Sequence, residues 1–124
     1  MSDFNESLYF RDLNRYPTLK PEEETALITI IKNGETEEIR QSALQHLIRG
    51  NLRFVVSIAR QYQGRGLSVD DLVSEGNVGL MKAAVKYDAT RGVRFAPFAA
   101  PYVRRSIERA LLRNMIATAD EAIA

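Results

Sequence analysis

Apolar residues recur every three to four positions along almost the whole chain, and no stretch shows the sustained alternation of a half-buried strand. This spacing is typical of amphipathic helices, whose apolar face packs against a core. The pattern therefore predicts an all-α fold, a compact multi-helix bundle. We find no internal repeat, low-complexity run or linker, so residues 1–124 are expected to form a single domain.

Prolines, glycines and capping residues predict the helix boundaries in the first part of the chain. A first helix is expected over residues 5–15, ended by Pro17. Pro21 suits the first turn of a second helix, and the Asn-Gly pair at residues 33–34 should stop it. A third helix should begin near Thr36.

The middle of the chain predicts two further helical segments. The apolar pattern of residues 39–62 continues across a Gly-Asn pair at residues 50–51, which indicates two helices or one bent helix. A glycine-containing turn follows at residues 63–66. Ser68 then caps a helix that should run to about Tyr87.

The last helix has an uncertain start, because it contains a proline. After a loop at residues 88–92, the helix should reach about Asn114, leaving residues 114–124 as an undistinguished tail. Proline inside a helix costs about 3 kcal/mol, since it removes a donor and clashes with the preceding turn. We therefore expect the helix to start or kink at Pro101, with residues 95–100 in a less regular lead-in.

Composition argues against several classes of function. The chain has no cysteine and a single histidine, His46, which excludes disulfides and thiolate metal sites and argues against a histidine-based metal or catalytic centre. No run approaches the roughly 20 apolar residues of a membrane span, and the N-terminus is unlike a signal peptide. We expect a cytoplasmic protein that is not an enzyme and needs no cofactor.

Charge is unevenly distributed along the chain, although the formal net charge is only +1. Acidic residues dominate residues 1–39, whereas residues 82–113 are rich in lysine and arginine. A basic segment of this kind suggests a polyanionic partner. A solvated arginine face would give the same pattern, so charge alone leaves both readings open.

Two segments carry a specific resemblance: residues 51–59 (NLRFVVSIA) and residues 71–88 (DLVSEGNVGLMKAAVKYD). Together they resemble conserved region 2 of the housekeeping-type bacterial sigma factor family. The resemblance assigns residues 35–113 to region 2. Residues 7–34, with Tyr16-Pro and a run of glutamates, are similar to region 1.2 of the same family.

The resemblance implies a surface that binds RNA polymerase. In this family the helix with this motif docks on a coiled coil of the β′ subunit of core RNA polymerase. By motif position, the expected contacts are Asp71, Ser74, Glu75, Asn77 and Met81. These positions, with Val78, fall mostly on one helix face and mix carboxylates with apolar anchors, as protein interfaces do. The alternative is a solvated face with Met81 in the core.

Gly76 and Gly79 lie inside the same predicted helix. Each costs about 1 kcal/mol relative to alanine in a helix interior. Close approach of another helix would offset that cost, because glycine lets two backbones meet. The sequence does not decide whether that neighbour is internal or belongs to the polymerase.

The resemblance also implies contact with promoter DNA. In this family the next segment captures the non-template strand of the minus-ten promoter element, with bases flipped into aromatic pockets. The expected DNA-binding residues are Arg91, Arg94, Phe95, Phe98, Tyr102, Arg104, Arg105 and Arg109. Core packing is the alternative for the aromatic residues. Val93 stands where the family usually has an aromatic residue, and Pro101 and Tyr102 replace its paired tryptophans.

Arginines at four-residue spacing predict a basic ridge on the last helix, formed by Arg105, Arg109 and Arg113 with Arg104 beside them. Such a ridge suits phosphate contacts. Arg105 replaces a glutamine of the family that reads a base edge, so this arginine could favour guanine or bind phosphate. A solvated face, locally paired with Glu108, is the alternative.

The sequence thus favours a sigma-like transcription initiation module whose partners are core RNA polymerase and promoter DNA, with an anti-sigma factor as a further candidate. A sigma-like regulator that binds polymerase without melting promoters, and a helical adaptor, are the rival hypotheses. No helix-turn-helix that would read the minus-thirty-five element follows, so either a fragment or a short natural protein fits. A monomer is the default expectation.

Overall fold

The computed structural model describes residues 18–123, and all of its regular elements are helical. The predicted all-α class is confirmed for this part of the chain. The expected helix at residues 5–15, with Tyr16 and Pro17 after it, lies outside the described residues. Among the helices described, none has the length and apolar character needed to cross a bilayer.

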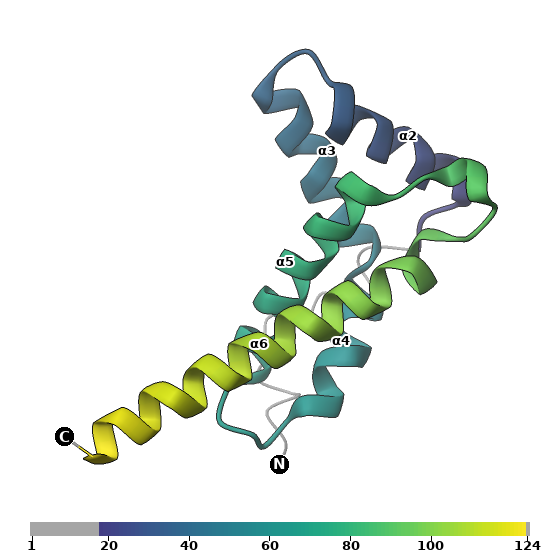
Figure 1. Ribbon diagram of the computed structural model, residues 1–124. Helices are drawn as coiled ribbons and strands as arrows, with labels where there is room; N and C mark the ends of the chain where they lie inside the picture. The colour runs from purple at the N-terminus through teal and green to yellow at the C-terminus, as the bar shows by residue number, and fades with distance from the viewer. Residues whose placement is uncertain (1–17, 124) are drawn as a thin grey trace.

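Within residues 18–123, five α-helices follow one another, joined by short turns (Figure 1). The α-helices are α2 (Pro21–Asn33), α3 (Glu37–Gly50), α4 (Leu52–Ala59), α5 (Val69–Lys86) and α6 (Phe95–Ile123). Two single 3-10 turns complete the set, η2 (Arg60–Tyr62) and η3 (Ala89–Arg91). Helices α2 and α3 form a hairpin at one end, and α6 runs diagonally across α5 and beyond it.

The capping residues lie where the sequence predicts them. Thr36 caps α3, its hydroxyl accepting a hydrogen bond from the Ile39 amide at 3.2 Å. Ser68 caps α5 in the same way, with the amide of Asp71 at 3.1 Å. Asn51 is buried between α3 and α4 and donates to the Leu47 carbonyl at 2.9 Å, so residues 39–62 form two helices rather than one bent helix.

Helix α6 corrects two boundary predictions. It begins at Phe95 and continues through Pro101, so residues 95–100 are helical and the predicted lead-in is wrong. Pro97 and Pro101 are both exposed, so water can reach the carbonyl that lacks a donor, while Ala99 and Val103 are fully buried on the opposite face. That packing offsets the cost of the proline.

The second correction concerns the end of α6. The helix does not stop near Asn114 but extends to Ile123. Residues 114–123 contain alanine, methionine and glutamate, which favour helix, and they lack glycine and proline. The predicted tail is therefore a helical extension.

A single core joins all five helices, and the crossing of α5 and α6 is its centre. Val73 and Leu80 of α5 are fully buried there. A Cβ atom on Gly79 would lie 2.3 Å from the Tyr102 carbonyl oxygen, and one on Gly76 would lie 2.8 Å from the Val55 side chain. The neighbours of both glycines are therefore internal, and Gly79 marks the point where the α5 and α6 backbones meet.

Candidate functional site

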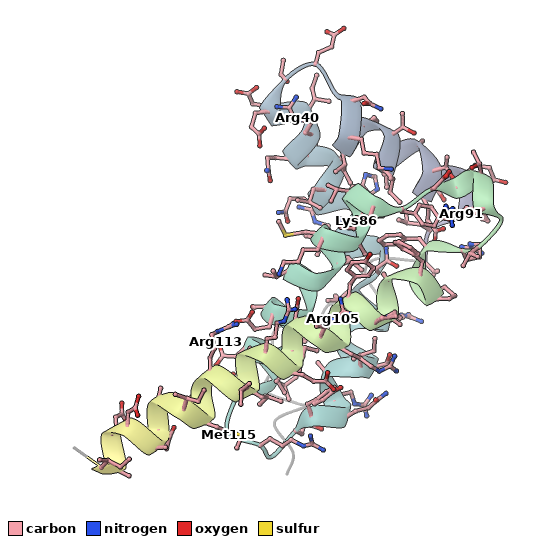
Figure 2. All side chains as sticks on the ribbon, viewed as in Figure 1. Arg40, Lys86, Arg91, Arg105, Arg113 and Met115 are labelled. Carbon is pink, nitrogen blue, oxygen red and sulfur yellow. The ribbon has the colours of Figure 1, made fainter. Side chains whose placement is uncertain are left out.

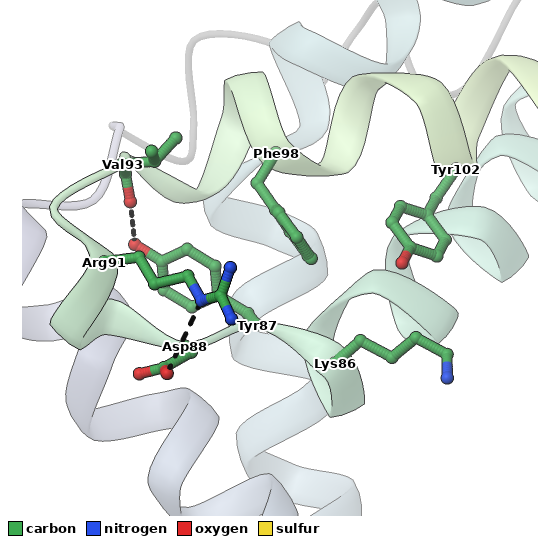
Figure 3. A pocket seen from close by; sticks show the side chains of 7 residues that line it. All are labelled: Lys86, Tyr87, Asp88, Arg91, Val93, Phe98 and Tyr102. Atoms are coloured by element: carbon green, nitrogen blue, oxygen red, sulfur yellow. Dashed lines mark hydrogen bonds and ion pairs between the residues drawn. The ribbon is translucent and has the colours of Figure 1, made fainter.

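An aromatic hollow of about 530 Å³ lies between the end of α5, the η3 turn and the start of α6 (Figure 3). It forms because Tyr87 ends α5 and the chain turns back over the next seven residues to begin α6. Side chains from all three elements line it: Lys86, Tyr87, Asp88, Arg91, Val93, Phe98 and Tyr102. We call this hollow the aromatic pocket.

Three aromatic rings form a continuous wall of the pocket. The Phe98 ring lies 5.4 Å from the Tyr87 ring and 5.4 Å from the Tyr102 ring, centroid to centroid. Phe95, predicted to contact DNA, is instead fully buried and meets Tyr87 edge-on at 5.3 Å. The structure corrects that assignment, because Phe95 supports the pocket from within the core and presents no surface to a ligand.

Tyr87 is held rigidly at the base of the pocket. Its hydroxyl donates to the Val93 carbonyl, and its own carbonyl accepts from the Lys32 ammonium group on α2. Burial raises the pKa of the Tyr87 hydroxyl above its usual value, so the group stays neutral and keeps its proton as a donor. The ring face is thus fixed in position before any ligand arrives.

The rim of the pocket carries two cations and one carboxylate. Arg91 is 83% exposed, and its contact with Asp88 is long, at 4.0 Å. Hydrogen bonds from Thr90 lower the pKa of the Asp88 carboxyl, so it is ionised at neutral pH. Lys86 is exposed beside them. Arg91 and Lys86 are therefore available to bind an anion at the mouth of the pocket.

Arg94, predicted to contact DNA, is largely engaged within the protein. Its guanidinium group forms a two-pronged ion pair with Glu24 of α2, at 3.0 and 3.2 Å, and reaches the Leu19 carbonyl at 3.5 Å. Glu24 is only 4% exposed. The pair also raises the pKa of Arg94. Arg94 thus ties α2 to the start of α6, next to the pocket.

The predicted basic ridge on α6 contains fewer available arginines than the sequence suggests. Arg104, Arg105 and Arg109 are exposed, and the Arg105 guanidinium lies 6.0 Å from the centre of the Tyr102 ring. Arg113 turns instead towards Glu75 of α5, at 3.5 Å. Glu108 accepts a hydrogen bond from Tyr62 at 2.9 Å. The exposed arginines of the ridge therefore begin beside Tyr102, at the edge of the pocket.

The outer face of α5 presents a second candidate surface. Five of its exposed residues follow one stripe of the helix, and Lys82 and Lys86 are exposed beside them. The stripe consists of Asp71, Ser74, Val78, Met81 and Val85. Met81 is 39% exposed, so the alternative that it lies in the core is wrong. Glu75 and Asn77 flank the stripe and are half-buried, and the buried Asn77 amide oxygen has no hydrogen-bond partner among the described residues.

The elements that form the aromatic pocket and the outer face of α5 match those of known proteins. Residues 47–115, which include α4, α5 and most of α6, match the Sigma-70 region 2 family. The chain belongs to the sigma-70 family.

Named relatives agree with this assignment. The RNA polymerase sigma factor SigA of Lactococcus lactis subsp. cremoris is 46% identical over 105 residues, which cover 84% of this chain. SigA of Clostridium acetobutylicum is 43% identical over 104 residues, and the sigma factor RpoS of Coxiella burnetii is 40% identical over 107 residues. The matched segments make up 28%, 26% and 29% of these relatives, so the chain spans little more than a quarter of their length.

Sequence reasoning about this sigma-70 chain found part of the pocket and missed the rest. Phe98, Tyr102 and Arg91 were predicted, whereas Lys86, Tyr87, Asp88 and Val93 were not. Tyr87 carried a signal, because an aromatic residue at the end of a long helix and just before a turn is well placed to line a hollow. Val93 also carried a signal, because it stands where the family usually has an aromatic residue, although its place in the pocket depends on how the chain turns back after η3.

Proposed function

We propose that this chain is a transcription-initiation module that binds core RNA polymerase through the outer face of α5 and holds an unpaired promoter base in the aromatic pocket. The aromatic pocket is the observation that carries this proposal. The role is one of binding: the energy of base capture stabilises unpaired promoter strands, and the polymerase performs the chemistry.

The aromatic pocket suits a flipped base in shape and chemistry. Its volume of about 530 Å³ lies within the range of small-molecule sites, and its walls are aromatic. Stacking of a base on an aromatic ring contributes about 1 to 3 kcal/mol and needs no sequence-specific hydrogen bond. Arg91 and Lys86 at the mouth can neutralise the phosphates on either side of the base.

The outer face of α5 suits a protein partner. It combines the carboxylate of Asp71 with the apolar side chains of Val78, Met81 and Val85, all exposed on one stripe. Carboxylates orient a basic partner, and apolar side chains supply buried area. The relatives named as RNA polymerase sigma factors support core polymerase as that partner, and we assign the contact to the coiled coil of its β′ subunit.

Replacing Phe98 with alanine should weaken capture of a non-template minus-ten strand by about tenfold or more, because the central ring of the wall is lost. The measurement is fluorescence anisotropy of a labelled minus-ten oligonucleotide, titrated with the complex of this chain and core polymerase. Phe98→Tyr is the matched control, since it keeps the ring and should stay close to the wild type. If Phe98→Ala and the wild type bound the strand with equal affinity, the proposal that a base binds in this pocket would be wrong.

Placing an unfavourable charge on the α5 stripe should weaken binding to core polymerase. We expect Asp71→Lys and Met81→Asp each to reduce affinity at least tenfold in a pull-down or interferometry assay, because each places an unfavourable group in the interface. Glu38→Lys is the control, since Glu38 lies in the first turn of α3 as Asp71 lies in the first turn of α5. Unchanged affinity in both α5 variants would place the polymerase contact elsewhere.

A second function, that of a regulator that occupies polymerase without melting promoters, is favoured by specific residues of this chain. Pro101 and Tyr102 stand where the family has paired tryptophans, and Arg94 is paired with Glu24 rather than free for DNA. The two functions separate in the assay above. Strand capture by the polymerase complex indicates initiation, and polymerase binding without capture indicates the regulator.

A further inference from the structure

The last turns of α6 project beyond the rest of the bundle (Figure 1). Every residue from 115 to 123 is exposed, although the helix continues unbroken to Ile123. Met115 lies on this projecting segment, just past Arg113, which still contacts α5 (Figure 2). The segment is thus a helical surface that the described core does not cover.

One face of the projecting segment is apolar. Leu112, Met115, Ile116 and Ile123 are 56%, 62%, 55% and 84% exposed. With two alanines they recur at spacings of three, one, three, three and one residues: Leu112, Met115, Ile116, Ala119, Ala122 and Ile123. This is the pattern of a helix that packs lengthwise against another helix. On the same side of the helix, Arg109 lies about one turn and Arg105 about two turns before Leu112, so basic residues precede the apolar face.

We propose that this face pairs with the same face of a second copy of the chain, in antiparallel orientation. Three large residues begin the face, and the small ones, Ala119 and Ala122, follow them before Ile123 at its end. An antiparallel pair sets large residues against small ones, which fills the space between the helices. A parallel pair would set alanine against alanine and leave gaps.

The charges beside the apolar face favour the same orientation. Arg113 and Asp120 lie on the same flank of the helix, two turns apart. In an antiparallel helix pair each flank faces its own counterpart, so Arg113 of one copy meets Asp120 of the other, twice. This register places the twofold axis between residues 116 and 117. Arg113 can still reach Glu75 of its own chain, because the Arg113 side chain is 64% exposed.

Self-association of this kind does not depend on the proposed function. Phe98 and Tyr102 of the aromatic pocket lie ten or more residues before Leu112, at the other end of α6. The pairing replaces the default expectation of a monomer. Because the interface is short, it belongs with weak assemblies, whose dissociation constants lie in the micromolar range.

Sedimentation equilibrium of the purified full chain across micromolar to millimolar concentrations tests the pairing. The wild type should change from monomer to dimer, and Ile116→Glu should raise the dissociation constant at least tenfold. Ile39→Glu is the matched control, because Ile39 is also an exposed isoleucine, at 48%, but lies on α3. A wild type that stays monomeric throughout, or an equal effect of both variants, would overturn the proposal.

The orientation has its own test, since the chain has no cysteine. Cysteine at position 116 should cross-link efficiently with a short thiol reagent, because the twofold axis passes beside it. Cysteine at position 123 should not, because the two copies of that residue would be about 20 Å apart along the axis, at a rise of about 1.5 Å per residue. Cross-linking at both positions would contradict the antiparallel arrangement.

Charge exchange gives an independent check of the register. Arg113→Glu and Asp120→Arg should each weaken the dimer, and the double variant should restore it, because the pair is rebuilt with opposite sense. No rescue would overturn the register. If the chain is monomeric and a cysteine at position 116 is protected from labelling, the face is covered within its own chain, and the proposal is wrong.

Discussion

Gly79→Ala should lower the free energy of unfolding by about 3 kcal/mol, the upper end of the usual cost of overpacking. The new methyl group would lie 2.3 Å from the Tyr102 carbonyl oxygen and 2.7 Å from the Val103 Cα, so two backbones must move apart. Alanine's better helix propensity returns only about 1 kcal/mol of this loss. Urea denaturation followed by circular dichroism measures the change.

Gly76→Ala is the matched comparison on the same helix. Its methyl group would meet the tip of the Val55 side chain, at 2.8 Å, rather than backbone atoms. A side chain can shift where a helix backbone cannot, so the destabilisation should be clearly smaller than that of Gly79→Ala. Equal effects at the two positions would show that the crossing of α5 and α6 does not depend on backbone contact.

Arg94→Ala should clearly destabilise the fold, because it leaves the Glu24 carboxylate buried without a partner. The expected loss lies below the full cost of breaking a buried pair, since the Arg94 side chain is 50% exposed. Glu24→Gln should cost less than Arg94→Ala, because it removes the buried charge itself. Thermal and urea denaturation of the three proteins measure these differences.

Arg91→Ala provides the control for this pair. Arg91 lies three residues away, is 83% exposed and makes only a 4.0 Å contact with Asp88, so its loss should change stability by less than about 0.5 kcal/mol. If Arg94→Ala proved equally mild, the ion pair with Glu24 would contribute nothing to the docking of α2.

The helices could be predicted from sequence because their signals are local. Thr36 and Ser68 accept hydrogen bonds from amides three residues ahead, and that spacing is visible in the sequence. Pro101 misled the prediction for the opposite reason. Its cost is local, but the packing that offsets it comes from α5, far away in the sequence. The length of α6 was missed for another reason, because residues 114–123 contain helix-favouring residues and no glycine or proline, which is a local signal.

Only those residues of the candidate site that the family resemblance or the helix periodicity indicates could be predicted from the sequence. The stripe from Asp71 to Met81 follows from spacing on one helix, and the structure leaves most of it exposed. Phe95 and Phe98 look alike in sequence, yet one is core and the other lines the pocket, since the roughly 60° between helix positions three residues apart moves Phe98 to the edge of the core. Periodicity separates such residues only when the position of the core is known.

The ion pair between Glu24 and Arg94 also bears on the order in which the chain can fold. Its partners are 70 residues apart, so forming the contact closes a long loop and costs chain entropy. During synthesis at about 5 to 20 residues per second, Glu24 leaves the ribosome roughly 4 to 14 seconds before Arg94. During that interval the Glu24 carboxylate of the α2–α3 hairpin stays in water. The pocket wall beside Arg94 is completed only when α6 has been synthesised.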